Sequence, residues 1–239
     1  MSIEIKAEKI SKAYSDSKKY ALRDFDFYAK EGTVTAVIGQ NGAGKSTLFK
    51  ILSGTIYCDE GSLSVCGKSD LNAIRSVCSY VPETLDYTKN FTVTEELYFY
   101  ASSFVEKDKV AEAVNKTCDF LSLNDVLDEK ISSLSKGYRQ RVNLAKGLCK
   151  NSDVLILDEF SSGLDSIQNI TFREKIKELA KHKILILSTH NLEEAQILCD
   201  YFYILDKGTN VFSGTKEALF NETSTENLSD AYKKIVLLD

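Results

Sequence analysis

The chain has 239 residues, of which 43% are hydrophobic, and it carries a formal net charge of −5. This length suits one large α/β domain or two small ones, with enough apolar residues for a sizeable core. The negative charge argues against a nucleic-acid partner, because binding to phosphate backbones needs a basic face. The N-terminus is charged, and no apolar run approaches the ~20 residues of a membrane span, so we expect a soluble chain.

The six cysteines show no CxxC pair and no Cys/His spacing typical of a metal site. Four of them lie in apolar or alternating segments, which predicts buried free thiols in a reducing cytoplasm.

Residues 1–33 alternate between apolar and polar side chains. Ile3, Ile5 and Ala7 share one face, and Phe25 and Phe27 follow in a second run. A period of two is typical of strands, so we expect antiparallel β structure here.

Residues 34–47 read VTAVIGQNGAGKST, a short apolar run that leads into a glycine-rich turn. The spacing Gly39-x-x-x-x-Gly44-Lys45-Ser46 is the P-loop pattern, in which backbone N–H groups converge on phosphate oxygens. A helix is expected over 47–52, with its positive dipole end toward the same phosphates. Lys45 is predicted to reach the β- and γ-phosphates, and the Ser46 hydroxyl to hold Mg²⁺.

Residues 84–150 are predicted to be mostly helical. Thr92 and Glu95 form a capping box. Apolar residues then recur at helical spacing in two segments; these are Val93, Leu97, Tyr100, Ala101 and Phe104, then Val110, Ala113, Val114, Thr117 and Leu121. The single proline, Pro82, lies at the junction before this zone.

Residues 151–215 return to strand and helix alternation, with the runs VLILDEF, KILILST and YFYILD. The first two runs are continuously apolar, as buried parallel strands require. Asn191 and Glu194 are expected to cap the helix between the last two runs, and 206–209 is predicted to form a hairpin turn. The tail, 216–239, is polar until an amphipathic end.

Asp158 and Glu159 end the first of these runs, at the edge where α/β sheets bind ligands. Because adjacent strand residues point to opposite faces, we expect the two acids to differ in role. Asp158 suits the Mg²⁺ shell, and Glu159 suits a general base that polarises the attacking water.

The fold class predicted is therefore α/β: a P-loop NTPase core with a parallel sheet, an antiparallel β subdomain and an inserted helical subdomain. We expect one domain over 1–239. Within it, 1–83 and 151–215 form the core, about 84–150 the helical subdomain, and 216–239 a tail.

The chain resembles the nucleotide-binding subunits of ATP-binding cassette (ABC) transporters over nearly all its length. Several motifs follow in the family's order. Tyr14 matches the aromatic residue that stacks on adenine, and 80–83 stands in the Q-loop position. Residues 134–138 (LSKGY) stand where the family has LSGGQ, 162–165 resemble the D-loop, and His190 stands in the position of the switch histidine.

The resemblance implies an ATPase that uses ATP and Mg²⁺, with catalytic residues Glu159, His190 and Lys45. The metal would be held by Ser46, Glu83 and Asp158. The implied nucleotide-binding residues are Tyr14, Gly39, Asn41, Gly42, Ala43, Gly44, Lys45, Ser46, Thr47, Glu83, Ser135, Gly137 and Asp165. Three have simpler interpretations: Tyr14 as a strand-end tyrosine, Ser135 as a helix N-cap and His190 as a structural histidine.

Four positions depart from the family's usual residues. Lys136 and Tyr138 replace a small residue and the glutamine of the signature. Glu83 replaces the Q-loop glutamine, and a carboxylate can still hold a water on Mg²⁺. Phe160 stands where a proline is usual. These variants resemble the exporter-like, ABC-2-type branch.

The implied mechanism is a two-fold dimer in which Ser135 and Gly137 of one subunit close over ATP held by the other. ATP binding would close the dimer and hydrolysis would reopen it. The partners expected are ATP, a second ABC subunit and a separately encoded transmembrane permease, on the cytoplasmic face of the cell membrane.

The main alternative is a soluble cassette ATPase that powers another process, such as cofactor assembly. The same motifs serve both functions. A GTPase is disfavoured because no Asn-Lys-x-Asp motif occurs. A non-hydrolytic module is disfavoured because Glu159 and His190 are both present.

Overall fold

The computed structural model describes residues 3–14, 19–159 and 166–237. Within these ranges the larger of two sheets has six strands. In spatial order they are β5 (Cys78–Val81), β6 (Val154–Leu157), β7 (Ile184–Ser188), β3 (Val34–Gly39), β8 (Tyr201–Asp206) and β9 (Thr209–Thr215). Neighbouring strands are parallel except for β8 and β9, which are antiparallel.

The central strands confirm the expectation drawn from their apolar runs. Every residue of β3, β6 and β7 is buried. The β8–β9 hairpin is also confirmed. Lys207 and Gly208 at its turn have φ of 45° and 84°, the left-handed values that a tight hairpin needs at both positions.

The second sheet has three strands, in the order β2 (Tyr20–Lys30), β1 (Glu4–Ala13) and β4 (Glu60–Val65), and both pairings are antiparallel. The antiparallel structure expected at the N-terminus is therefore confirmed. The ring of Phe27 on β2 stacks on Tyr203 of β8 with 4.6 Å between centroids, which joins the two sheets.

Helix α1 (Lys45–Leu52) begins two residues before the expected start and buries Leu48, Phe49, Ile51 and Leu52 in a core that draws on both sheets. Three elements of this region were not predicted: β4, α2 (Leu71–Val77) and β5. Most residues of β4 are exposed or half-buried, so this edge strand carries little of the alternation by which a strand is recognised.

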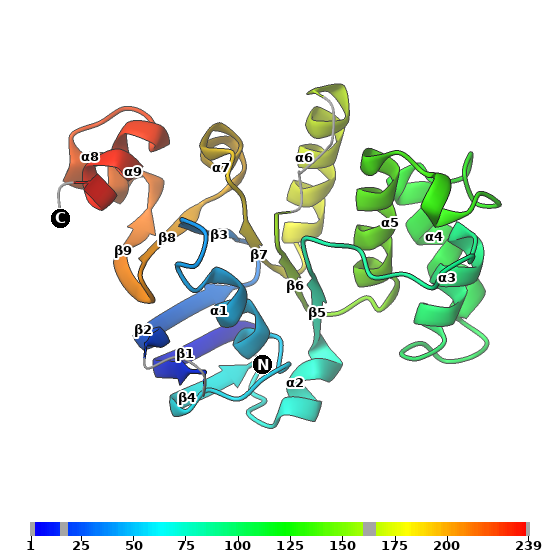
Figure 1. The fold of residues 1–239 in the computed structure, drawn as a ribbon, viewed down its shortest axis with the longest axis horizontal. Helices are drawn as coiled ribbons and strands as arrows, with labels where there is room; N and C mark the ends of the chain where they lie inside the picture. The colour runs from blue at the N-terminus through cyan, green and yellow to red at the C-terminus, as the bar shows by residue number, and fades with distance from the viewer. Residues whose placement is uncertain (1–2, 15–18, 160–165, 238–239) are drawn as a thin grey trace.

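Helices α3 (Val93–Ala101), α4 (Val110–Leu121) and α5 (Lys136–Cys149), with a short 3₁₀ turn η1 (Ile131–Ser133), separate β5 from β6 in the chain. They form a lobe at one end of the molecule (Figure 1, green). The capping box of α3 is present as expected. The expectation that Phe104 continues the helical spacing is wrong, because α3 ends at Ala101; Phe104 is exposed.

In the described range 166–237 there are four helices: α6 (Ser166–Ala180), α7 (Leu192–Leu198), α8 (Lys216–Thr223) and α9 (Leu228–Leu237). Asn191 caps α7 by accepting a hydrogen bond from the N–H of Glu194, as predicted. Helix α9 is the expected amphipathic end, whereas α8 lies in a stretch expected to be only polar. Both α8 and α9 lie at the end of the molecule opposite to α3, α4 and α5 (Figure 1).

The cysteines are free thiols, and Cys78, Cys118, Cys149 and Cys199 are buried, as expected. Burial raises the pKa of the Cys149 thiol to about 11. None of the described helices combines the length and the apolar character needed to span a bilayer.

Candidate active site

The loop between β3 and α1 needs glycine for two reasons. Gly42 and Gly44 have φ of 82° and 110°, which side chains disfavour. A Cβ on Gly44 would also lie 2.5 Å from the carbonyl oxygen of Ala21, and a Cβ on Gly39 would lie 2.6 Å from that of Leu205. Gly44 has no side chain with which to cap α1, so the N–H groups of the first turn can serve an anion.

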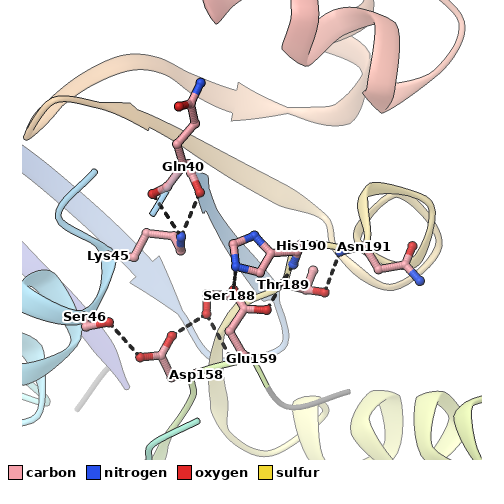
Figure 2. A network of polar contacts seen from close by, with 10 residues as sticks. Gln40, Lys45, Ser46, Asp158, Glu159, Ser188, Thr189, His190 and Asn191 are labelled. Atoms are coloured by element: carbon pink, nitrogen blue, oxygen red, sulfur yellow. Dashed lines mark hydrogen bonds and ion pairs between the residues drawn. The ribbon is translucent and has the colours of Figure 1, made fainter. Parts of the chain in front are cut away.

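Lys45 lies inside this loop and is only 7% exposed. Its Nζ donates hydrogen bonds to the carbonyl oxygens of Gly39 (2.7 Å) and Gln40 (3.3 Å). Figure 2 shows the side chain folded back onto this backbone. Burial lowers the pKa of Lys45, although the negative charges of Glu159, Asp158 and Glu83 oppose the shift. A buried ammonium with weak carbonyl partners is well suited to exchange them for a phosphate.

Asp158 follows β6 directly and its carboxylate accepts three hydrogen bonds from hydroxyls. Oδ2 accepts from Ser46 Oγ (3.0 Å) and from the Tyr80 hydroxyl (3.2 Å), and Oδ1 accepts from Ser188 Oγ (2.5 Å). Burial, together with the charge of Asp158 and this hydrogen bond, raises the pKa of Tyr80, so its phenol remains a donor. The P-loop helix and the carboxylate are thus in direct contact.

Glu159 does not continue the strand. Its φ of 49° is left-handed, and β6 has already ended at Leu157. The expected alternation of Asp158 and Glu159 between opposite faces therefore does not apply, and both side chains line one cavity. The turn is held by a hydrogen bond of 3.0 Å from the Glu159 N–H to Ser188 Oγ.

The Glu159 carboxylate contacts His190 through both oxygens (Figure 2). Oε2 accepts from the His190 N–H (3.1 Å), and Oε1 lies 3.2 Å from Nε2. Among the described residues none donates a well-directed hydrogen bond to Oε1. Burial raises the pKa of Glu159, against the opposing effects of His190 and Lys45. An oxygen with an open lone pair and a raised pKa suits a general base.

These groups surround a cavity of about 190 Å³. Its walls combine the P-loop with residues from the ends of β5, β6 and β7. The lining residues are Ala21, Gln40, Asn41, Gly42, Gly44, Lys45, Ser46, Thr47, Glu83, Asp158, Glu159 and His190. A phosphate cradle, a lysine, paired acids and a histidine thus meet at one place.

The family model for ABC transporters matches residues 22–162. The chain belongs to this family. It is an ATP-binding subunit, and its ATPase activity is coupled to transport.

Two relatives illustrate the similarity. Nod factor export ATP-binding protein I of Burkholderia orbicola is 33% identical over 215 residues, which cover 88% of this chain and 70% of the relative. An uncharacterised ABC transporter ATP-binding protein of Methanocaldococcus jannaschii is 34% identical over 219 residues, covering 91% and 79% of the two chains.

Solved structures of ABC subunits share the fold. An ATP-binding subunit of an ABC transporter superposes with a TM-score of 0.87 at 26% identity, covering 97% of this chain and 98% of the other. The cbiO1 subunit of Clostridium perfringens, part of the cbiONQ transporter complex, gives 0.78 at 26% identity, with 91% and 90% covered. A dimeric cassette bound to ADP and phosphate gives 0.81 at 21% identity, with 88% and 98% covered.

The cavity of this ABC subunit brings together most of the residues expected at the nucleotide site. Gly39 and Ala43 are not in its lining. Gly39 contributes the carbonyl oxygen that accepts a hydrogen bond from Lys45, and Ala43 is a buried residue of the loop. Tyr14 is 43% exposed, and its hydroxyl lies 3.4 Å from Thr47 Oγ1, close enough to border the site.

Two further expected residues, Ser135 and Gly137, are not among the residues that line this cavity. Ser135 and Gly137 belong to the start of α5, where the Ser135 side chain accepts a hydrogen bond from the Tyr138 N–H at 3.4 Å. The N-cap expectation for Ser135 is thus confirmed, and its function remains a prediction. Asp165 and the other D-loop positions, together with Phe160, lie outside the described residues.

Sequence reasoning assigned no role to four residues that the structure brings to the site: Ala21, Gln40, Tyr80 and Ser188. Ala21 comes from β2 and belongs to none of the motifs. Gln40 fills a variable P-loop position and acts through its backbone. The signal for Ser188 was its place at the end of a buried strand, directly before Thr189 and His190.

The site residues fit a magnesium ion that arrives with ATP. The Ser46 hydroxyl and the Asp158 carboxylate are hard oxygen donors 3.0 Å apart at the cavity wall. No group of three or more His, Cys, Asp or Glu residues in the described ranges could hold a metal ion unaided. Mg²⁺ in nucleotide sites is characteristically held by one or two protein oxygens together with substrate phosphates.

Proposed function

We propose that this chain is the ATP-hydrolysing subunit of an ABC exporter, which works as a dimer and drives a separately encoded membrane permease. The observation that carries the hydrolytic part is the position of Glu159. Glu159 lines the P-loop cavity, its Oε1 receives no well-directed hydrogen bond from the described residues, and its carboxylate contacts His190. The export part draws on the Nod factor export protein, which is 33% identical.

In the proposed reaction a water molecule attacks the γ-phosphorus of ATP. A P–O bond forms to that water, and the bond between the γ-phosphorus and the β,γ-bridging oxygen breaks, so that ADP leaves. The Glu159 carboxylate takes the proton from the water. Lys45 turns from its carbonyl partners to the β- and γ-phosphates, and His190 keeps Glu159 oriented. Ser46 and Asp158, with Glu83 nearby, would hold a magnesium ion, which would supply charge neutralisation at the phosphates.

The dimer follows from the place of the signature helix. Ser135 and Gly137 stand at the N-terminus of α5, which carries the positive end of the helix dipole. They are absent from the cavity of their own chain. A cassette of the same fold is dimeric with ADP and phosphate bound. We therefore assign these residues, with Asp165, to the ATP held by a second subunit.

Permease docking is assigned to the aromatic cluster at residues 91–104. Phe99 and Phe104 are 63% and 52% exposed, and Phe99 meets Phe91 edge to face at 6.0 Å. Exposed apolar clusters are typical of interaction surfaces. The cluster begins eight residues after Glu83, which lines the nucleotide cavity. A displacement of Glu83 on ATP binding or hydrolysis could therefore be transmitted to a permease docked on the cluster.

The domain organisation follows the same proposal. Residues 1–83 and 151–215 serve as the nucleotide-binding core, about 84–150 as the helical subdomain and 216–239 as a tail. The subunit lies on the cytoplasmic face of the membrane through its permease. The cassette ATPase of a non-transport process, which the motifs alone left open, has no structural observation in its favour.

The decisive experiment is affinity purification of the tagged chain from detergent-treated membranes, with identification of a polytopic membrane protein among the partners. Phe99→Ser should lose this partner. Ile197→Ser is the control, because Ile197 is likewise a large exposed apolar residue, at 52%, but lies on α7. Absence of any membrane partner would overturn the transport role, and equal loss in both variants would overturn the docking site.

A further inference from the structure

Tyr80 lies on β5 next to the Asp158 carboxylate, and both its backbone and its ring are held in place. On one side β5 pairs with β6 in parallel, with Tyr80 opposite Ile156, and the pairing continues as a hydrogen bond of 2.9 Å from the Asp158 N–H to the carbonyl oxygen of Val81. On the other side the Tyr80 ring meets Phe49 of α1 edge to face, with centroids 6.4 Å apart. The hydroxyl is thereby fixed at 3.2 Å from Asp158 Oδ2.

The three hydroxyls on Asp158 have different freedom. Ser188 Oγ donates to Oδ1 and accepts from the Glu159 N–H, so it is committed on both sides. Ser46 Oγ shares Oδ2 with Tyr80. When Ser46 coordinates a cation through a lone pair of its oxygen, its O–H can still donate to Asp158 Oδ2. Tyr80 is a second donor on the same oxygen, and unlike Ser46 it has no part in the cation shell.

We propose that Tyr80 is a positioning residue, whose hydroxyl holds Asp158 Oδ2 toward the magnesium ion that accompanies ATP. This inference rests on the proposed nucleotide site and names a further residue in it.

The chain offers a well-matched pair of variants. Tyr80→Phe removes one oxygen and keeps the ring that packs on Phe49. Tyr203→Phe removes the hydroxyl of a buried tyrosine that accepts from the Tyr28 N–H (2.8 Å) and donates to its carbonyl oxygen (3.2 Å), outside the cavity. Tyr203→Phe therefore reports a general loss of packing and polar contacts, without a change next to Asp158.

The measurement is the affinity for a slowly hydrolysed, fluorescent ATP analogue, once with Mg²⁺ and once with EDTA. We expect Tyr80→Phe to leave the affinity in EDTA unchanged and to reduce the gain from Mg²⁺ by about tenfold, which corresponds to one hydrogen bond to a charged group. Tyr203→Phe should keep the full gain. An unchanged gain in Tyr80→Phe, or an equal reduction in both variants, would overturn the positioning role.

A double-mutant cycle separates this role from the proposed function itself. In an Asp158→Asn background, Tyr80→Phe should have no further effect on the Mg²⁺ gain, because it acts through the Asp158 carboxylate. Additive losses would overturn the inference. A wild-type protein that binds the analogue equally well with Mg²⁺ and with EDTA would overturn the cation site as well. Dependence on Mg²⁺ in the wild type with a normal Tyr80→Phe would overturn only the role of Tyr80.

Discussion

Glu159 and His190 are joined twice: the His190 N–H donates to Oε2 at 3.1 Å, and Nε2 lies 3.2 Å from Oε1. The backbone contact needs no particular side chain at position 190, whereas the ring contact does. A substitution at position 190 therefore removes the ring contact and keeps the backbone contact. The roles of Glu159 and of the His190 ring can thus be tested by separate substitutions.

Glu159→Gln should retain ATP binding and lose turnover. The amide keeps the size of the carboxylate but cannot take the water proton, so we expect kcat to fall by ~10²–10⁴-fold. The variant should form an ATP-stabilised dimer, visible in size-exclusion chromatography with ATP and absent without nucleotide. Hydrolysis at the wild-type rate would remove Glu159 from the role of base.

His190→Ala should reduce turnover with little change in ATP affinity. The His190 side chain is 56% exposed, so its removal should not disturb the core. It leaves the backbone hydrogen bond to Oε2 intact but frees the carboxylate to rotate. Misplacement of a catalytic group by about 1 Å costs about 100-fold in rate, so we expect a loss of turnover of that order. Steady-state kinetics with a thermal melt test this, and a protein that melts much earlier would instead support a structural role for His190.

The sequence predicted the elements that carry strong periodicity or a motif, such as β3, β6, β7 and the capped α3. It did not predict β4, whose outward face is solvated, or α8, whose apolar residues are few. The left-handed turn at Glu159 was also missed. Such a turn at a non-glycine residue depends on the tertiary contact from Ser188, which no local pattern indicates. The signature residues Ser135 and Gly137 lie away from the site of their own chain, so a single chain does not test their role.

Lys45→Ala should weaken ATP binding and abolish hydrolysis. Among the described residues, Lys45 Nζ donates to the carbonyl oxygens of Gly39 and Gln40, and its loss removes the phosphate contact that would replace these bonds. A charge-assisted hydrogen bond contributes about 1.5–3 kcal/mol, or about 10- to 150-fold in affinity. Titration with ATP in the presence of Mg²⁺ measures the effect. Affinity within twofold of the wild type would contradict the assignment of Lys45.

Glu96→Gln should destabilise the helical lobe in a pH-dependent way. Glu96 is 2% exposed and accepts hydrogen bonds from Lys146 Nζ (2.7 Å) and the Thr88 N–H (2.9 Å). Burial acts to raise its pKa, but these hydrogen bonds and the charge of Lys146 outweigh burial and lower the pKa from 4.5. The contribution of Glu96 to stability is thus present above about pH 4.5 and is lost as the pH falls through the lowered pKa.

Urea unfolding at pH 7 and at acid pH tests this. At pH 7 we expect Glu96→Gln to lose about 1.5–3 kcal/mol of unfolding free energy, as for a hydrogen bond to a charged group. The difference from the wild type should shrink as the solution is acidified. Glu106→Gln is the control, because Glu106 forms an exposed pair with Lys109 and such pairs contribute little. A pH-independent difference would show that the ionised form of Glu96 is not what stabilises the lobe.

Glu83 stands where the nucleotide cavity meets the helical lobe. It lines the cavity, and the carbonyl oxygen of the preceding Pro82 accepts a hydrogen bond of 2.6 Å from Asn143 Nδ2 on α5. Pro82 restricts the backbone just before Glu83, and its carbonyl connects this backbone to α5, the signature helix. A displacement of Glu83 by the nucleotide would therefore be transmitted to α5. Glu83→Gln replaces the carboxylate by an amide of the same size, and ATPase activity of the isolated subunit should survive.

Glu83→Ala removes both the oxygen ligand and the group that transmits movement. It should reduce permease-stimulated ATPase activity more than the basal activity of the isolated subunit, because only the stimulated rate depends on transmission through this segment. The measurement compares the reconstituted complex with the isolated subunit for both variants. Equal fractional losses in the two settings would limit Glu83 to a role as a nucleotide-side ligand. A wild-type subunit that its membrane partner does not stimulate would contradict the coupling altogether.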